Sequence, residues 1–189
     1  YTIYGNKNQT FVSFKVIPDH LKHATIAIED KDFYKHGAID IRGIARALLA
    51  NITSQEIQQG GSTITQQLVK NSLLTFDQTI QRKVKEIILA FIVESTHSKD
   101  QILELYLNQI SYGGTAYGVQ AASEVYFDKP VSKLTLAESA YLAALPEAPS
   151  LYSPFGSHPE DGKLRQEEVL SRMQEQGYIT SEQEKKKKK

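Results

Sequence analysis

Two glutamates, Glu29 and Glu86, lie where carboxylates can divide the roles of acid and base between them. Glu29 follows an apolar helical stripe and has Ile28 as its neighbour, whereas Glu86 lies among the basic residues Arg82, Lys83 and Lys85. Burial raises the pKa of a carboxylate, and a nearby cation lowers it. The two environments therefore differ, as a general acid and base pair requires. A structural ion pair or an exposed surface carboxylate is the alternative for each.

The stretch from Gln58 to Asn71 combines two consecutive glycines, several hydroxyl and amide side chains, and one lysine. Thr63 and Gln66 form a capping box, which predicts a helix start whose free N–H groups favour anions. Thr63, Gln67 and Lys70 share one face of that helix. This pattern indicates a polar wall for an anionic or sugar-like ligand. A glycine turn followed by an ordinary solvated helix face is the alternative.

Four basic side chains, Lys70, Arg82, Lys83 and Lys85, could clamp phosphate groups, with the arginine as a bidentate fork. A pyrophosphate leaving group would require such a cluster, and simple hydrolysis would not. A solvated basic helix face is the alternative. His36 is a further candidate ligand or base, but the histidines form no helical pair and no HExxH motif, so a metal site has weak support.

Helical spacing and capping signals account for most of the chain. Pro18-Asp19 opens the first helix, and residues 2–16 are predicted to form a short hairpin or an extended arm. The buried stripe of the first helix consists of Ile17, Leu21, Ala24 and Ile28. Further helices are expected over residues 40–53, 63–74, 79–94, 98–110, 136–145 and 159–177. Another helix is expected to pass through Ala121-Ala122 and end at Phe127, and a last one to begin at Thr180. The fold class is therefore all-α, or mainly α.

The predicted helix over residues 79–94 changes character along its length. Its first half is basic, and beyond Glu86 it reads Ile-Ile-Leu-Ala-Phe-Ile-Val, apolar on every side. Such a helix is usually central in a fold. We therefore expect Glu86 to mark the point where the helix enters the core.

Composition excludes several classes of function. The 189 residues hold 22 basic and 22 acidic side chains, and without the run Lys185–Lys189 the balance is acidic, which argues against nucleic-acid binding. The absence of cysteine excludes disulfides and thiolate chemistry. The sequence contains no run of about 18 or more apolar residues, so it predicts no transmembrane helix. The abrupt start at Tyr1 suggests a fragment of a longer protein.

Several ordered motifs resemble those of the family-51 peptidoglycan glycosyltransferases, the glycan-polymerising domains of class A penicillin-binding proteins and of monofunctional transglycosylases. The likeness extends from about Pro18 to Pro154. It rests on Glu29–His36, Gln59–Gln67 with Lys70-Asn71, Arg82–Glu86, Ser98-Lys99, Ile102–Glu104, Tyr106–Asn108, Gly113 and Ala143–Pro146. Two places depart from the family pattern: the order His36-Gly37-Ala38, and Gln78, where an arginine is frequent.

The resemblance implies a lysozyme-like helical lobe with a smaller, membrane-facing jaw lobe at roughly residues 37–76. The glycosyltransferase domain would span residues 18–180, after an arm or linker at 1–17 and before a truncated helix and lysine tail at 181–189. Lipid II and the growing glycan strand would be the substrates, at the extracytoplasmic face of a bacterial cell membrane. A phosphoglycolipid inhibitor of the moenomycin type and other cell-wall synthesis proteins are further expected partners.

The resemblance also implies roles for individual residues. Glu29 would be the general base for the acceptor 4-hydroxyl, and Glu86 would assist the departing polyprenyl pyrophosphate. Cations or a divalent metal ion, Mg or Mn, would neutralise that group, and the reaction would invert the anomeric centre. The expected substrate-binding residues are Asp30, Phe33, His36, Gln59, Gly61, Ser62, Thr63, Thr65, Gln66, Gln67, Lys70, Asn71, Arg82, Lys83 and Lys85.

Two other classes of function remain open. A muramidase-like hydrolase on the same kind of fold would also use two glutamates, but it needs neither the cation cluster nor the hydroxyl and amide wall. An inactive membrane or cell-wall binding module would not depend on either carboxylate.

Overall fold

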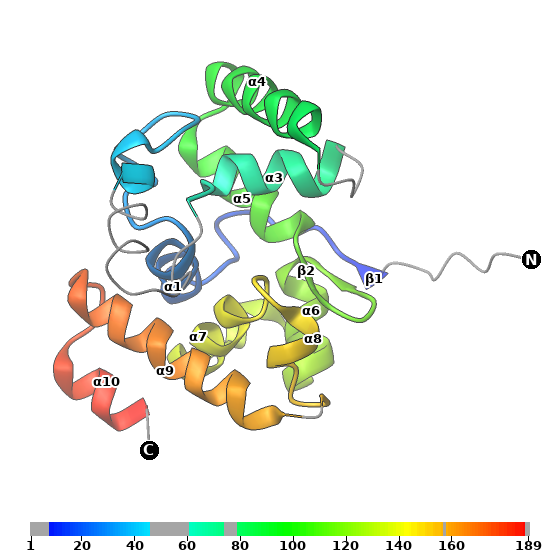
Figure 1. The fold of residues 1–189 in the computed structure, drawn as a ribbon. Coiled ribbons are helices and arrows are strands. Elements are labelled where there is room, and N and C mark those ends of the chain that lie inside the picture. Colours follow the sequence, from blue (N-terminus) through cyan, green and yellow to red (C-terminus); the bar gives the residue numbers. More distant parts are fainter. Residues whose placement is uncertain (1–7, 46–60, 74–78, 157, 188–189) are drawn as a thin grey trace, which may run out of the picture. The chain divides into compact units, whose positions relative to one another are not determined.

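The computed structural model describes residues 8–45, 61–73, 79–156 and 158–187 (Figure 1). The chain divides into two compact units: unit 1 comprises Tyr1–Lys31 and Glu104–Lys189, and unit 2 comprises Asp32–Leu103. The elements are β1 (Asn8–Gln9), α1 (Asp19–Glu29), α3 (Ile64–Leu73), α4 (Ile80–Thr96), α5 (Lys99–Gln109), β2 (Ser111–Gly113), β3 (Ala116–Tyr117), α6 (Gly118–Phe127), the 3-10 helix η1 (Val131–Lys133), α7 (Leu136–Ala144), α8 (Pro149–Tyr152), α9 (Pro159–Glu175) and α10 (Ser181–Lys187). The predicted mainly helical class is confirmed.

Capping boxes begin the helices that the sequence predicts over residues 98–110 and 136–145. At α7, the Thr135 hydroxyl accepts from the Glu138 backbone N–H while the Glu138 carboxylate accepts from that of Thr135. Ser98 and Gln101 make the same reciprocal contacts before α5. These helix starts depend only on residues three apart, which is why the sequence alone locates them. For the helix predicted over 40–53, residues 41–45 are helical and the remainder lies outside the described residues.

Three short strands form a sheet in unit 1 that the sequence does not predict. β1 pairs in parallel with β3, with Asn8 opposite Ala116, and β2 pairs antiparallel with β3. The segment around β1 is therefore not a local hairpin in its described part. The partner of β1 is far away in sequence, and no local pattern reveals such a pairing. The short helix α8 is also absent from the sequence-based prediction.

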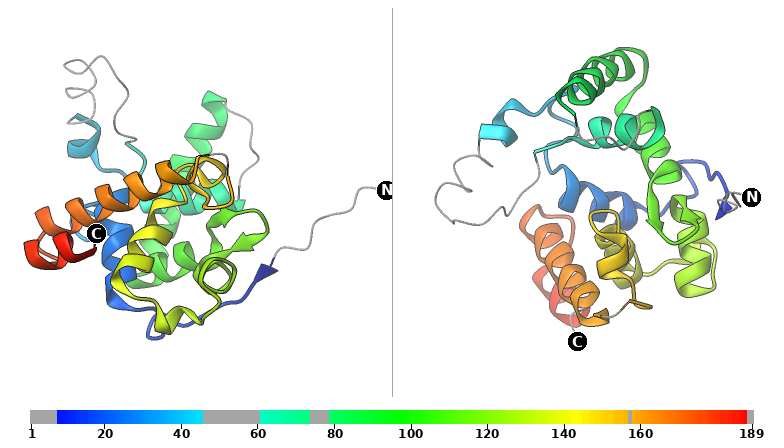
Figure 2. Two further views of the ribbon diagram at one scale, coloured as in Figure 1. Left: turned by 90° about the horizontal axis from the view of Figure 1, so that it is seen from below. Right: turned by 45° about the vertical axis from the view of Figure 1, so that its right-hand side comes forward.

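The core of unit 1 lies where α1, α7 and α9 pack together (Figures 1 and 2). Small residues on two of these helices, among them Ala24, Ala27, Ala140 and Ala143, let the backbones approach closely around Val169, Leu170 and Met173. All four residues of the stripe predicted for α1 are buried. This packing holds the C-terminal end of α1, and therefore Glu29, against a rigid support.

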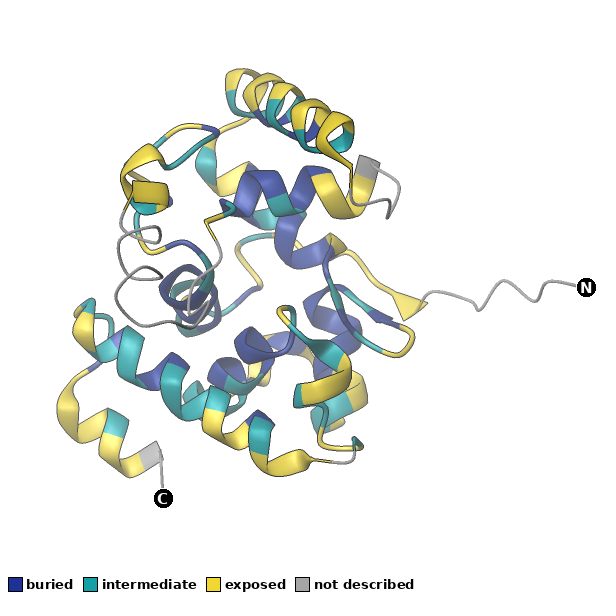
Figure 3. Ribbon diagram, viewed as in Figure 1, coloured by how far each residue is buried: buried dark blue, intermediate teal, exposed yellow. Residues whose placement is uncertain are grey.

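Helix α4 of unit 2 contradicts the prediction that its apolar half is central. Its apolar side is exposed to solvent, and its buried residues are Glu86 and Ala90 (Figure 3). Ile80, Val84, Ile88, Phe91 and Ile92 are each between 50% and 85% exposed. Ala38, Val69 and Ala90 form one buried apolar cluster of unit 2. Among the described helices, none is long and apolar enough to cross a membrane.

The predicted jaw lobe at residues 37–76 belongs to unit 2, although residues 46–60 and 74–76 lie outside the described part. The described part of the predicted arm, residues 8–17, belongs to unit 1. The predicted lobe and domain limits remain predictions. The lysine run is partly helical, because α10 includes Lys185–Lys187.

A buried asparagine joins the N-terminal segment to α5. The Asn108 side chain accepts from the Val12 backbone N–H (2.8 Å) and donates to the Val12 carbonyl (3.0 Å) and to the Glu104 carbonyl (2.8 Å). Gly118 lies beside this joint with φ 78°, and a Cβ there would meet the Asn108 carbonyl oxygen at 2.5 Å. The joint therefore requires a glycine at position 118.

We expect Asn108→Ala to lower the free energy of unfolding by about 2–3 kcal/mol, because the polar groups of Val12 would lose their partners inside the protein. Chemical denaturation monitored by circular dichroism measures the change. Asn8→Ala is the control, since Asn8 is exposed. Equal stability of the two variants would show that the Asn108 joint contributes nothing.

Candidate functional site

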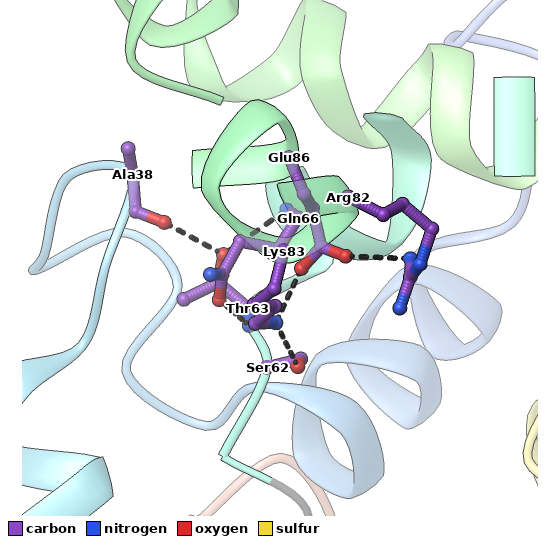
Figure 4. Close-up of polar contacts among 7 residues, drawn as sticks. All are labelled: Ala38, Ser62, Thr63, Gln66, Arg82, Lys83 and Glu86. Atoms are coloured by element: carbon purple, nitrogen blue, oxygen red, sulfur yellow. Dashed lines mark hydrogen bonds and ion pairs between the residues drawn. The ribbon is translucent and has the colours of Figure 1, made fainter. Parts of the chain in front are cut away.

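The carboxylate of Glu86 lies at the centre of a charged cluster in unit 2 (Figure 4). Its side chain is 2% exposed, one oxygen accepts from the Arg82 guanidinium at 3.1 Å, and the other accepts from the Lys83 ammonium. Lys83 also donates to the Ser62 hydroxyl at 3.1 Å. A buried carboxylate needs such partners, because an unpaired charge inside a protein is costly. Two cations around one anion leave this cluster with a positive surplus.

The local geometry of α4 produces this cluster. Arg82 and Lys83 precede Glu86 by four and three residues, the spacings that bring side chains together on a helix. The Thr79 hydroxyl caps the helix by accepting from the Arg82 backbone N–H at 3.1 Å. The Nε of Arg82 is buried and has no hydrogen-bond partner among the described residues.

The start of α3 is held by its own buried polar side chains. The Thr63 backbone N–H donates to the Gln66 side chain (2.9 Å), and the Thr63 hydroxyl donates to the Ala38 carbonyl (2.9 Å) and accepts from the Gln66 backbone N–H (3.2 Å) (Figure 4). The Thr65 hydroxyl donates to the carboxylate of Glu94. Thr63, Thr65 and Gln66 therefore already have partners within unit 2. They support the approach to α3 at Gly61 and Ser62.

Other residues of the predicted polar wall are accessible. Gly61, Lys70 and Asn71 on this segment are exposed, and Ser62 and Gln67 are half-buried. Lys85 on α4 is also exposed, so the inner part of the predicted phosphate clamp is Arg82 and Lys83. Gln59 lies outside the described residues, and so does Gln78, where the sequence differs from the family pattern.

Glu29 is the last residue of α1 in unit 1 and is half-buried, and Asp30 beside it is buried. Two fully buried tyrosines, Tyr106 of α5 and Tyr112 of β2, lie within its electrostatic reach. Burial first, and then the negative charge of Glu29, raise the pKa of both phenols above their usual range. Both phenols are therefore neutral at physiological pH. The electrostatic surroundings of Glu29 therefore include uncharged, water-excluded phenols.

The segment after Glu29 and Asp30 continues into unit 2, where Phe33 is fully buried. Its ring makes edge contacts with Tyr34 and with His36, and one ring nitrogen of His36 lies 2.6 Å from the Gly37 carbonyl oxygen. Phe33 therefore supports this segment from inside, and the half-buried His36 is the more accessible of the two predicted binding residues.

The two glutamates belong to different units. Glu29 lies in unit 1 and Glu86 in unit 2, and each has the local environment described above. The separation expected for an inverting pair, about 6.5–9.5 Å by analogy with inverting glycosidases, stays a prediction.

The surroundings of Glu86 do not favour a metal ion. Both of its carboxylate oxygens already bind cationic side chains. In the described parts of the chain, no group of three His, Asp or Glu side chains is placed to hold a metal. We therefore assign no step of the chemistry to the divalent cation that the resemblance allowed.

Sequence reasoning gave no role to several side chains of these surroundings. Tyr106 and Tyr112 come within the electrostatic influence of Glu29 from a helix and a strand that only tertiary packing brings there. Glu94 and Lys99 bind each other at 2.8 Å across the end of α4, and no helical spacing predicts that pair.

Comparison with known proteins identifies the family of this chain. The sequence profile described as "Transglycosylase" matches residues 1–174. Penicillin-binding protein 1A of Aquifex aeolicus is 51% identical over 183 residues, 97% of this chain and 25% of that protein. Penicillin-binding protein 1F of Bacillus subtilis is 49% identical over 175 residues, 93% of this chain and 24% of that protein.

A solved structure supports the same assignment. The crystal structure of penicillin-binding protein 1A from Haemophilus influenzae matches with a TM-score of 0.58 at 26% identity, covering 96% of this chain and 17% of that one. The chain thus spans about a quarter of the length of the curated relatives named above. With a profile that matches most of its length, the chain belongs to the transglycosylase family, as its motifs predicted.

Proposed function

We propose that this chain is a peptidoglycan glycosyltransferase domain, which polymerises lipid II into β-1,4-linked glycan and releases polyprenyl pyrophosphate. The observation that carries the proposal is the buried Glu86 carboxylate holding Arg82 and Lys83 beside Ser62. A positively charged, preorganised group of donors is what a pyrophosphate leaving group requires. Family membership supports the same reaction.

In this proposal Glu29 is the general base. Its carboxylate takes the proton from the 4-hydroxyl of the acceptor sugar as that oxygen attacks the anomeric carbon of the donor. The new carbon–oxygen bond forms on the face opposite the breaking bond to phosphate, so the α-linked donor gives a β-link. The packing of α1 against α7 and α9 holds this base in place.

Glu86 acts on the leaving group through its cations. The electron pair of the breaking bond moves onto the pyrophosphate, whose growing negative charge is stabilised by Arg82 and Lys83. Arg82 offers a planar fork that suits phosphate oxygens, and Lys83 shares its ammonium with Ser62. Lys70, Lys85, Gln67 and Asn71 are accessible and add charge and hydrogen bonds. Thr63, Thr65 and Gln66 position the loop that carries Gly61 and Ser62.

The hydrolase alternative does not account for this cluster, because hydrolysis of finished glycan produces no pyrophosphate. Incubation with lipid II and, separately, with finished glycan distinguishes the two activities. Polymer growth from lipid II supports the transferase. Shortening of finished glycan without any polymer growth would overturn the proposal.

A membrane surface is part of the proposal, since the substrate is lipid-linked. The exposed apolar side of α4, formed by Ile80, Val84, Ile88, Phe91 and Ile92, supports contact of unit 2 with lipid. Lys85, exposed on the same helix, suits anionic headgroups. The location at the extracytoplasmic face, the moenomycin-type inhibitor and other cell-wall proteins as partners stay predictions.

The variant Glu29→Gln should lower the rate of lipid II polymerisation by about 10³-fold, because a neutral amide cannot accept the proton. Product glycan separated by gel electrophoresis gives the rate. Glu182→Gln in α10 is the control, since this exposed carboxylate lies in a terminal helix. If the Glu29 variant retains near-normal turnover, the base has been misassigned.

Neutralising Glu86 should release its cations from their fixed positions. We expect Glu86→Gln to lower turnover by about 10²-fold, comparable to the loss of an oxyanion donor.

Lys83→Met should weaken the binding of a polyprenyl pyrophosphate, whereas Lys133→Met, at an exposed lysine of η1, should not. Isothermal titration with farnesyl pyrophosphate measures both affinities. Equal affinities would remove Lys83 from the pyrophosphate site.

The apolar side of α4 gives a membrane test. The double variant Ile88→Ser with Phe91→Ser should bind vesicles of anionic phospholipid at least about tenfold more weakly, because each side chain loses its apolar contact with lipid. Co-sedimentation with the vesicles gives the bound fraction. Phe155→Ser with Leu164→Ser is the matched control, as both residues are exposed apolar side chains of unit 1. Unchanged binding of the α4 variant would contradict a membrane role for this helix.

A further inference from the structure

A second charged cluster of unit 2 surrounds Glu94, near the C-terminal end of α4. One oxygen of its carboxylate accepts from the Thr65 hydroxyl and from the Lys99 ammonium, the latter at 2.8 Å. Thr65 is fully buried, and the side chains of Lys99 and Glu94 are only 19% and 13% exposed. This pair is therefore largely withdrawn from water, unlike the surface ion pairs that contribute little.

The cluster also reaches the segment that follows Glu29 and Asp30 in the chain. The Lys99 ammonium lies 4.5 Å from the centroid of the buried Phe33 ring. Beside it, the Tyr34 hydroxyl donates to the Asp100 carboxylate at 2.8 Å. The first turn of α5 therefore holds this segment by a cation–π contact and by a hydrogen bond.

Three helices thus meet at Glu94. Thr65 belongs to α3, Glu94 to α4, which carries Glu86, and Lys99 to α5. Glu94 follows Glu86 by two turns of α4, or about 12 Å at 1.5 Å per residue, so it lies well away from the cluster at the other end. The contact between Thr65 and Glu94 therefore joins α4 to α3, and the contact between Lys83 and Ser62 joins α4 to the segment before α3 at a separate point.

Two directional contacts fix the register of the helices in addition to the apolar contacts between them. Val69 of α3 and Ala90 of α4 are buried in one cluster, against which Leu89 and Val93 of α4 also pack. Apolar packing is close but sets no preferred direction, whereas a hydrogen bond to a charged group requires a defined distance and angle. The polar contacts therefore contribute directly to where Lys83 lies relative to Ser62.

We propose that Glu94 is a positioning residue, which holds Thr65 and Lys99 and thereby keeps α4 in the register that places Arg82 and Lys83 for a pyrophosphate. The identity of the ligand in this inference rests on the proposed function, whereas the positioning of α4 by Glu94 does not. Glu94 itself does not touch the ligand. Its influence passes through α4 to the cations of Glu86.

The test compares Thr65→Val, which removes the hydroxyl at nearly constant volume, with Thr65→Ser, which retains it. We expect Thr65→Val and Glu94→Gln to weaken the binding of farnesyl pyrophosphate by about five- to tenfold. The affinities are measured at a temperature well below the unfolding temperature of each variant. Thr65→Ser should bind within about twofold of the wild type. Equal affinity of the valine and serine variants would overturn the inference, because the hydroxyl would then have no part in positioning.

Lys99→Met has a matched control in Lys129→Met, which disrupts a similarly sheltered pair with Glu138 in unit 1. Both changes remove one ammonium and one ion pair, so both should lower stability to a similar extent. Only Lys99→Met should weaken pyrophosphate binding. If Lys129→Met weakens binding equally, the effect is general destabilisation and positioning by the Glu94 cluster is refuted.

Hydrogen–deuterium exchange separates this inference from the proposed function. Thr65→Val should raise the exchange of amides in residues 80–87, the turns of α4 that carry the cations, above that of Thr65→Ser. Unchanged exchange there would overturn the inference even if the wild type polymerises lipid II. Failure of the wild type to polymerise lipid II or bind farnesyl pyrophosphate would instead overturn the proposed function, while raised exchange would still support the positioning role.

Discussion

The charge of Glu86 is the constraint on which unit 2 depends. A carboxylate 2% exposed to solvent is tolerable only when cations and hydrogen-bond donors surround it, and Arg82 and Lys83 meet that need from the same helix. The requirement orients α4 so that its charged side faces inward. The same arrangement concentrates positive charge around one anion, beside the hydroxyl of Ser62. A structural necessity and the site that we propose for an anionic leaving group therefore coincide.

The orientation of α4 has a consequence for its other side. With Glu86 and Ala90 buried, Ile80, Ile88, Ile92 and Phe91 of this helix are left in solvent. In most domains these residues would face inward and the charges outward, since apolar burial is the main favourable term in folding. The reversed arrangement agrees with the lipid-linked substrate that we propose, because the exposed side can then contact lipid.

The two proposed catalytic carboxylates have different supports. Glu29 ends a helix packed on small residues, and its electrostatic surroundings include neutral, buried phenols. Glu86 is held directly by cations. A base and a leaving-group site need this contrast, since the first must accept a proton and the second must keep its cations in place. The contrast between these two environments was predicted from sequence, and the role of the tyrosines was not.

Local patterns and motifs predict the helical class, the helix starts near residues 63, 98 and 135, the buried stripe of α1, and the family. These features depend on residues within one or two turns of each other, or on whole motifs. Long-range packing, in contrast, sets which side of α4 is buried, the pairing of β1 with β3, and the contacts of Glu94 with Thr65 and Lys99. Helical periodicity shows that one side of α4 is apolar, but whether that side is buried depends on what packs against it. The need to pair a buried charge at Glu86 outweighs the hydrophobic preference there, and that need arises only once the chain is folded.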